Sequence, residues 1–207
     1  IYTTDVSGTD DTASGNSAYG YQALDAITTG DNNVAIGLSA LGANTTGANN
    51  VAVGSIAFDA NTTGGQNVAI GYTAMGAQTT ASNNVAVGNQ ALQTNQTGTE
   101  LVAVGHEALK ANLGDACVAV GFQALLANTT GASNIAIGST ALAANTTGSR
   151  NIGIGSNAND SSDTENDNIA IGYNAMTTDS AGGLQNLAIG NYALQALTSG
   201  DGNMALG

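Results

Sequence analysis

Basic residues are nearly absent from this chain, which has 2 Lys and Arg residues against 15 Asp and Glu among 207 residues and a formal net charge of −13. Such a charge repels nucleic-acid phosphates and anionic lipid, so the composition excludes nucleic-acid binding. Proline and tryptophan are missing, and the single Cys excludes a framework of intrachain disulfides. No run of about 18 apolar residues is present, which argues against direct membrane insertion.

The scarcity of charge does not indicate disorder. Only 8% of the residues are charged and 42% are apolar, whereas disordered acidic tails combine high charge with low hydrophobicity. We therefore expect a folded chain whose stability comes from backbone hydrogen bonds and many small contacts. Because the chain begins at Ile1 and has no basic segment leading into an apolar stretch, we expect a mature or excised soluble segment.

One glycine recurs through the chain with a period of 17 residues. The spacing changes only twice, to 16 between Gly105 and Gly121 and to 18 between Gly172 and Gly190. The residue four before this glycine is Asn in ten of twelve copies, with Leu101 and Cys117 as exceptions, and the residue two before it is Ala in all but one. The unit reads Asn-Val-Ala-Ile-Gly, two variable residues, Ala-Leu, and roughly Ala-Asn-Thr-Thr-Gly.

This unit predicts a parallel β-solenoid. Seventeen residues are too few for a helical hairpin, and Thr-Thr-Gly interrupts every unit where a helix would continue. Asn-Val-Ala-Ile-Gly alternates as a strand does, and the Ala-Leu step is long enough for a second, shorter strand. The repeat glycine provides a positive φ or a close backbone approach, and both length changes fall in the return turn. We predict an all-β array of about twelve 17-residue coils over residues 16–207, after a diverged first coil or cap at 1–15.

The ends of the chain fall at nearly the same point of a coil, because Thr3 lies twelve periods before Gly207. We therefore expect a stretch of a longer array, with caps or neighbouring chains outside it to cover the strand edges.

Both faces of the predicted strand are free of charge. In one arrangement Val, Ile and Leu fill the coil, and the alanines pack against another chain; in the other, Ala fills a narrow interior and Val and Ile lie outside in a neighbour's groove. Either arrangement favours an oligomer. The alanines that form these oligomer or core columns are Ala35, Ala52, Ala69, Ala86, Ala103, Ala119, Ala136, Ala170 and Ala188.

The string Asn-Val-Ala-Ile-Gly-x-x-Ala-Leu-x-Ala resembles the head repeat of the trimeric autotransporter adhesins, the YadA-like β-roll, from Asn16 to Gly207. Similar repeats occur in bacteriophage tail fibres. The resemblance implies a left-handed parallel β-roll, association of three copies side by side, and display on a cell surface for adhesion. The unit here is longer than is usual in that family by the Thr-Thr-Gly of the turn.

Reactive residues are few. His106 lies beside Glu107 and Lys110, with Asp115 and Cys117 nearby, but no further His or Cys completes a zinc site, and His106 and Cys117 occupy different columns. Because a repeat presents the same group on every coil instead of converging different groups, we expect no enzyme and no cofactor. Asp163, Glu165 and Asp167, with Asp160, form a weak calcium candidate, since the EF-hand and calcium β-roll patterns are lacking. A solvated acidic turn is the alternative, as it is for Asp5, Asp10 and Asp11.

The residues just after the repeat glycine vary most, and variable exposed columns are where solenoids carry recognition. Aromatic rings there offer stacking area for a host-surface glycan or protein, and the alternative is that they pack over neighbouring coils. The candidates for a ligand surface are Tyr21, Tyr72, Phe122, Tyr173 and Tyr192. The Asn-x-Thr patterns, such as that at Asn44, are expected to be turn chemistry before glycosylation sites.

From these observations we expect a structural and adhesive fibre segment, extracellular and exposed on a cell or virion, whose main partner is itself as a homotrimer or filament. A bacteriophage tail-fibre shaft and a self-assembling filament subunit are the alternatives. An ice-binding solenoid is a weaker alternative, because the Thr pairs lie in the turn and are interrupted at Gln96, Leu113 and Asp163.

Overall fold

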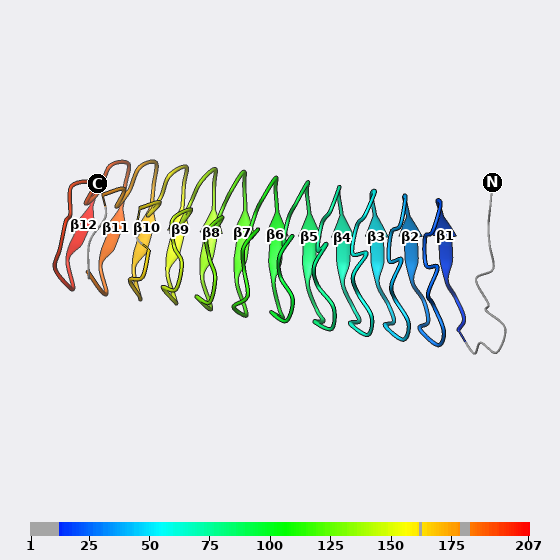
Figure 1. Cartoon of the computed structure of the whole chain (residues 1–207). Helices are drawn as coiled ribbons and strands as arrows, with labels where there is room; N and C mark the ends of the chain where they lie inside the picture. Colours follow the sequence, from blue (N-terminus) through cyan, green and yellow to red (C-terminus); the bar gives the residue numbers. More distant parts are fainter. Residues whose placement is uncertain (1–12, 162, 179–182) are drawn as a thin grey trace.

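A computed structural model describes residues 13–161, 163–178 and 183–207 as a rod of stacked coils (Figure 1). One parallel sheet runs along the rod, and its twelve strands follow one another in sequence order. The predicted all-β solenoid with 17-residue coils is thus confirmed. The strands are β1 (Ser17–Tyr19), β2 (Val34–Ile36), β3 (Val51–Val53), β4 (Val68–Ile70), β5 (Val85–Val87), β6 (Val102–Val104), β7 (Val118–Val120), β8 (Ile135–Ile137), β9 (Ile152–Ile154), β10 (Ile169–Ile171), β11 (Leu187–Ile189) and β12 (Met204–Leu206).

Equivalent residues of successive coils lie side by side. Ala35 pairs with Ala52, and Ala52 pairs with Ala69, so the alanines form one file along the sheet. The short coil keeps this register, since Val102 pairs with Val118, and the long coil keeps it as well, since Ile169 pairs with Leu187. The length changes are therefore absorbed in the turns, as predicted. Most of the segment 1–15 lies outside the described residues, as do Ala181 and Gly182 of the long turn.

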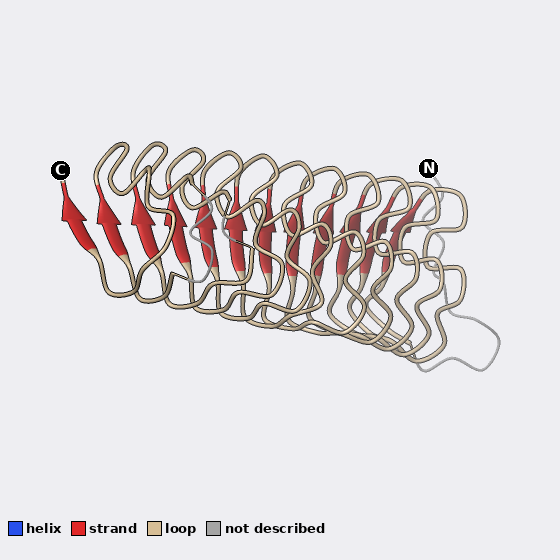
Figure 2. Cartoon of the chain, turned by 60° about the vertical axis from the view of Figure 1, so that its left-hand side comes forward, coloured by secondary structure: helices blue, strands red, loops and turns tan. Residues whose placement is uncertain are grey.

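The prediction of a second strand at the Ala-Leu step is wrong. Each coil between residues 13 and 207, so far as it is described, has one strand, and loops form its other sides (Figure 2). The leucine of the step has a left-handed backbone, with φ of 50° at Leu41, and an extended strand cannot include that conformation. The step is still tied to the next coil, because the Leu41 amide donates to the Ala57 carbonyl at 3.1 Å.

The repeat glycine turns the chain out of each strand. From Gly20 to Gly190 its φ lies between 128° and 140°, a region that L side chains rarely adopt. It also lies against the next coil, since a Cβ added to Gly71 would be 2.4 Å from the Gly88 carbonyl oxygen. Both reasons proposed from the sequence, positive φ and close approach, therefore apply at the same residue.

Small apolar side chains fill the inside of the rod. The strand alanines face the Ala-Leu steps, and Leu41, Phe58 and Met75 are fully buried in one file. The core divides into two clusters, one ending at Leu142 and the other starting at Ala158. In the coil between the clusters Gly153 replaces the strand alanine and Asn159 replaces the leucine, which accounts for the division. No helix in the described part of the chain has the length and apolar character needed to cross a bilayer.

Asparagine amides form a second component of the interior. Asn67 accepts the Asn84 amide at 3.0 Å, and the side-chain nitrogen of Asn67 donates to the Ala81 carbonyl at 3.0 Å. Most coils repeat this arrangement, and Leu101 and Cys117 interrupt it. These buried side chains satisfy backbone groups that no strand partner reaches.

Candidate functional site: two outer surfaces of the solenoid

The outer face of the sheet is an apolar strip without charge. It consists of the first and third residues of each strand from β2 to β11, which are Val, Ile or Leu throughout. The first residue of each strand is half-buried, and the third is half-buried or exposed. The strands occupy one side of the rod, so this outer strip is continuous along it (Figure 2).

The strand alanines lie inside the coil, in the second of the two arrangements considered from the sequence. Ala35, Ala52, Ala69, Ala86, Ala103, Ala119, Ala136, Ala170 and Ala188 are all fully buried within the single chain. The alternative in which Val and Ile fill the coil is wrong because the opposite wall is too near. A Cβ added to Gly153, in the alanine file, would lie 2.9 Å from the Ala158 carbonyl oxygen and 3.0 Å from Leu142 Cγ. Even a methyl group is crowded at this coil, so the larger branched side chains have no room inside and point outward.

A second surface adjoins the strip at the column that directly follows the repeat glycine. Tyr21 is 74% exposed there, Tyr72 and Phe122 are 50% exposed, and Tyr173 is 44% exposed. The column is ordered by hydrogen bonds between coils, such as that from the Gln90 amide to the Tyr72 carbonyl at 3.0 Å. Tyr192 lies one residue later in its coil and meets Tyr173 edge to face, with ring centroids 5.4 Å apart. The five candidate rings therefore remain open to solvent in the single chain.

His106 belongs to a polar patch beside Phe122. The two rings are stacked, with centroids 5.5 Å apart and planes inclined by 13°. Glu107 accepts from Lys110 Nζ at 2.6 Å and from Gln123 Nε2 at 2.7 Å, and Lys110 also donates to Gln90 at 3.3 Å. These hydrogen bonds, that from Lys110 foremost, lower the pKa of Glu107.

The two glutamines of this patch, Gln90 and Gln123, were not predicted from the sequence as part of a site. Gln90, Glu107 and Gln123 all lie two residues after a repeat glycine, in successive coils. Aligning the chain on the period would have placed them in one file. The side-chain contacts between them required the structure.

Cys117 does not belong to the patch. Its side chain is buried, and its Sγ lies 3.4 Å from the Gly131 carbonyl oxygen and 3.5 Å from that of Asp115. Burial raises the pKa of this thiol, which opposes its ionisation. Cys117 thus contacts backbone carbonyls, whereas His106 stacks on Phe122.

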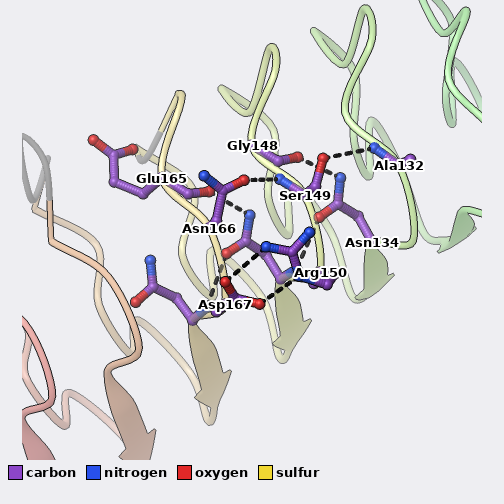
Figure 3. A network of polar contacts seen from close by, with 10 residues as sticks. Ala132, Asn134, Gly148, Ser149, Arg150, Glu165, Asn166 and Asp167 are labelled. Atoms are coloured by element: carbon purple, nitrogen blue, oxygen red, sulfur yellow. Dashed lines mark hydrogen bonds and ion pairs between the residues drawn. The ribbon is translucent and has the colours of Figure 1, made fainter.

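The acidic turn does not gather its carboxylates. Asp167 is held by Arg150 of the preceding coil, through Nε–Oδ1 and Nη2–Oδ2 distances of 2.6 and 2.8 Å, and this pair lowers the pKa of Asp167 (Figure 3). The buried Glu165 side chain extends away from Asp167 (Figure 3). Asp163 is exposed and accepts from Thr146 through its backbone carbonyl. Across the described residues, His, Cys, Asp and Glu form no group of three or more that could hold a metal ion.

The Asn-x-Thr segments form the return turns. Asn61 is fully buried and donates to the Gly64 carbonyl at 3.0 Å and to Asn44 Oδ1 of the preceding coil at 2.8 Å. The first threonine uses its hydroxyl internally as well, since Thr45 Oγ1 donates to the Thr62 carbonyl at 3.0 Å. Turn chemistry therefore explains these residues.

Comparisons of the chain with protein-family models, with curated proteins and with solved structures found no match.

Proposed function

We propose that this chain is a non-enzymatic segment of an adhesive fibre, extracellular and displayed on a cell or virion, in which three copies associate side by side through the outer strip. The observation that supports this proposal is the strip itself. It is continuous and uncharged, on a chain whose net charge is −13.

The size of the strip supports an interface. The strands from β2 to β11, stacked about 4.8 Å apart and three residues wide, give a surface about 48 Å long and about 10 Å wide. A strip of about 480 Å² lies within the range of the largest apolar patches of monomers, about 300–600 Å², and such patches commonly mark interaction sites. Covering it contributes about 25 cal/mol for each Å² of apolar surface removed from water, which must exceed the entropy that the copies lose on association.

A second copy of the chain is the occupant that fits best. Its Val and Ile files have the same spacing along the rod, so side chains of one copy enter the gaps of the other over the full length. The strip itself is uncharged, so it neither adds to nor offsets the electrostatic repulsion between two acidic chains. Closed association of three copies removes each strip from water without an open edge, in keeping with the preference of oligomers for closed symmetry.

The variation between coils supports binding over catalysis. The interior positions repeat the same residues, whereas the column after the repeat glycine changes from coil to coil and is largely exposed. Recognition residues concentrate on exposed, variable positions that a rigid scaffold holds in place. A bacteriophage tail-fibre shaft would use the same assembly.

The molar mass in solution tests the assembly. We expect sedimentation equilibrium to give three times the chain mass of 20.2 kDa. The double substitution Val87→Glu/Val104→Glu places two charges in the strip and should yield a monomer with unchanged circular dichroism. Gln96→Asp is the matched control, because the equivalent turn position already carries Asp163, and it should remain a trimer.

Three results would contradict the proposal. A monomeric wild-type rod would show that the strip needs no partner. A double variant that remains a trimer would place the interface elsewhere. Fibres of indefinite length would replace the closed trimer with a self-assembling filament.

A further inference from the structure

The exposed aromatic residues of the variable column recur at every third coil. Each of the glycines after β1, β4, β7 and β10 is directly followed by an aromatic residue, namely Tyr21, Tyr72, Phe122 and Tyr173. Three coils correspond to about 14 Å along the rod. The column therefore carries four rings in a row at an even spacing, which we call the aromatic row.

The positions between these rings are mostly small or polar. Ser55, Asn89 and Ser139 are examples, and the apolar Leu38 is the exception. The four rings of the row consequently stand apart from one another, and the rings that touch them are His106 beside Phe122 and Tyr192 beside Tyr173. A protein partner binds chiefly through a compact, desolvated cluster of anchors, which separated rings do not provide.

A polar file runs beside the aromatic row, two residues after each repeat glycine. Thr140 donates to Asn157, and Asn157 Nδ2 donates to Asn174 Oδ1 at 2.8 Å. In the middle of the rod, Gln90 and Gln123 flank the ion pair between Glu107 and Lys110. Amides and hydroxyls of this kind offer both donors and acceptors next to the ring faces.

We propose that the aromatic row binds a neutral polysaccharide that lies along the rod. Sugar rings have apolar C–H faces that stack on aromatic rings, and hydroxyls at their edges that amide and carboxylate groups can bond. The stacked pair of Phe122 and His106, next to Glu107 and Lys110, combines both features and forms the central contact. A chain of net charge −13 repels acidic glycans, which leaves neutral ones.

Even spacing gives the row its affinity. One exposed ring contributes little, but several rings engaged by one polymer chain act as linked sites, and linkage raises the overall affinity without new contacts. A glycan that spans two rings, about 14 Å apart, should therefore bind much more tightly than a shorter one. This inference rests on the proposed adhesive function and names the chemical class of its ligand.

Affinity electrophoresis of the whole chain tests the inference. The gels contain one of four neutral polymers, namely hydroxyethylcellulose, laminarin, a galactomannan or soluble starch, with polygalacturonate as the anionic comparison. We expect at least one neutral polymer, and not polygalacturonate, to retard the wild-type protein. Tyr72→Ser/Phe122→Ser should weaken that interaction at least tenfold. The chain itself has Ser55 and Ser139 in this column, so serine is compatible with the fold.

Two further variants separate ring stacking from general hydrophobicity. Leu38→Ser removes an apolar side chain from the same column and should change the affinity less than twofold. Ser55→Tyr/Tyr72→Ser keeps the number of rings but shifts one of them by a coil, and we expect severalfold weaker binding. Thermal unfolding of each variant checks that the rod is intact.

The outcomes also separate this inference from the proposed assembly. Retardation by none of the neutral polymers, or equal retardation of the wild type and the Tyr72→Ser/Phe122→Ser variant, overturns the polysaccharide site. Loss of the trimer in that variant assigns the rings to the interface between copies and overturns it as well. A monomeric wild-type protein that still binds through the rings overturns only the assembly.

Discussion

At the scale of single residues, the repeat glycine is the position that tolerates least change. Gly71 has a φ of 134°, and a side chain there would meet the backbone of the next coil. Strain and collision therefore act together, which explains why glycine directly follows every strand from β1 to β11.

We expect Gly71→Ala to destabilise the rod by about 3 kcal/mol or more, since a strained φ alone costs about 1–3 kcal/mol and the collision adds to it. Urea unfolding followed by circular dichroism measures the loss. Gly76→Ala is the control, because Ala143 occupies the equivalent position and the nearest contact is 3.3 Å, to the Thr73 carbonyl oxygen. Equal effects of the two substitutions would refute the special role of Gly71.

The carboxyl of Asp59 predicts a pH dependence. Burial raises its pKa, and its Oδ1 is buried without a hydrogen-bond partner. A raised pKa means that ionisation disfavours the folded state, so stability is full below the pKa of the unfolded chain, about 3.9, and falls as the pH rises through the folded pKa. Asp59→Asn should therefore raise the Tm at pH 7 relative to the wild type.

That gain should shrink as the pH is lowered and disappear near pH 3, where the wild-type carboxyl is protonated in both states. Differential scanning calorimetry of the two proteins between pH 3 and pH 7 follows the difference. A gain that is constant with pH would mean that desolvation of the charge is not its cause.

At the scale of the elements, each coil depends on amides as much as on apolar side chains. The strands are only three residues long, and the turns that join them bury backbone groups inside the rod. The asparagine files bind these groups from one coil to the next, as Asn67 binds Asn84 and Ala81. Leu101 and Cys117 replace two such amides directly before β6 and β7, at the two ends of the short coil.

Asn67→Ala should destabilise the rod by about 2–6 kcal/mol, because it leaves a buried amide and a buried carbonyl without partners at about 1–3 kcal/mol each. The midpoint of urea unfolding reports the loss. Gln66→Ala is the control, since its side chain is exposed and Ala116 holds the equivalent position, and it should change stability by less than about 0.5 kcal/mol. A similar, small effect at Asn67 would mean that water replaces the amide.

At the scale of the whole molecule, one surface is apolar and the chain is strongly acidic. Copies that associate through the outer strip bring together chains of net charge −13, and their repulsion opposes assembly. Salt screens such repulsion over about 10 Å at 0.1 M.

We therefore expect the proposed trimer to become more stable with rising salt. Sedimentation equilibrium in 10 mM and 300 mM NaCl should give a lower dissociation constant at the higher concentration. The opposite trend would indicate ion pairs between copies, which the uncharged strip does not offer.

The candidate surfaces were predictable in part. The period alone places Tyr21, Tyr72, Phe122 and Tyr173 in one exposed column, because equivalent residues of stacked coils must lie in files. The partners of Glu107 and Asp167 were not evident, because their contacts depend on which side chains reach across neighbouring coils. Arg150 and Asp167 are nonetheless 17 residues apart, which a search for opposite charges one period apart would have found.

The sequence by itself determined the stacking of 17-residue coils. When a short unit repeats at a regular spacing, each strand can pair only with the equivalent strands of the coils before and after it. The tertiary structure decided which face of the strand points inward. Alternation creates two uncharged faces without ranking them, and the opposite wall of the coil lies so near the strand that only a small residue, Ala or Gly, fits between. The branched side chains lie outside for that reason, and they form the outer strip on which the proposed function depends.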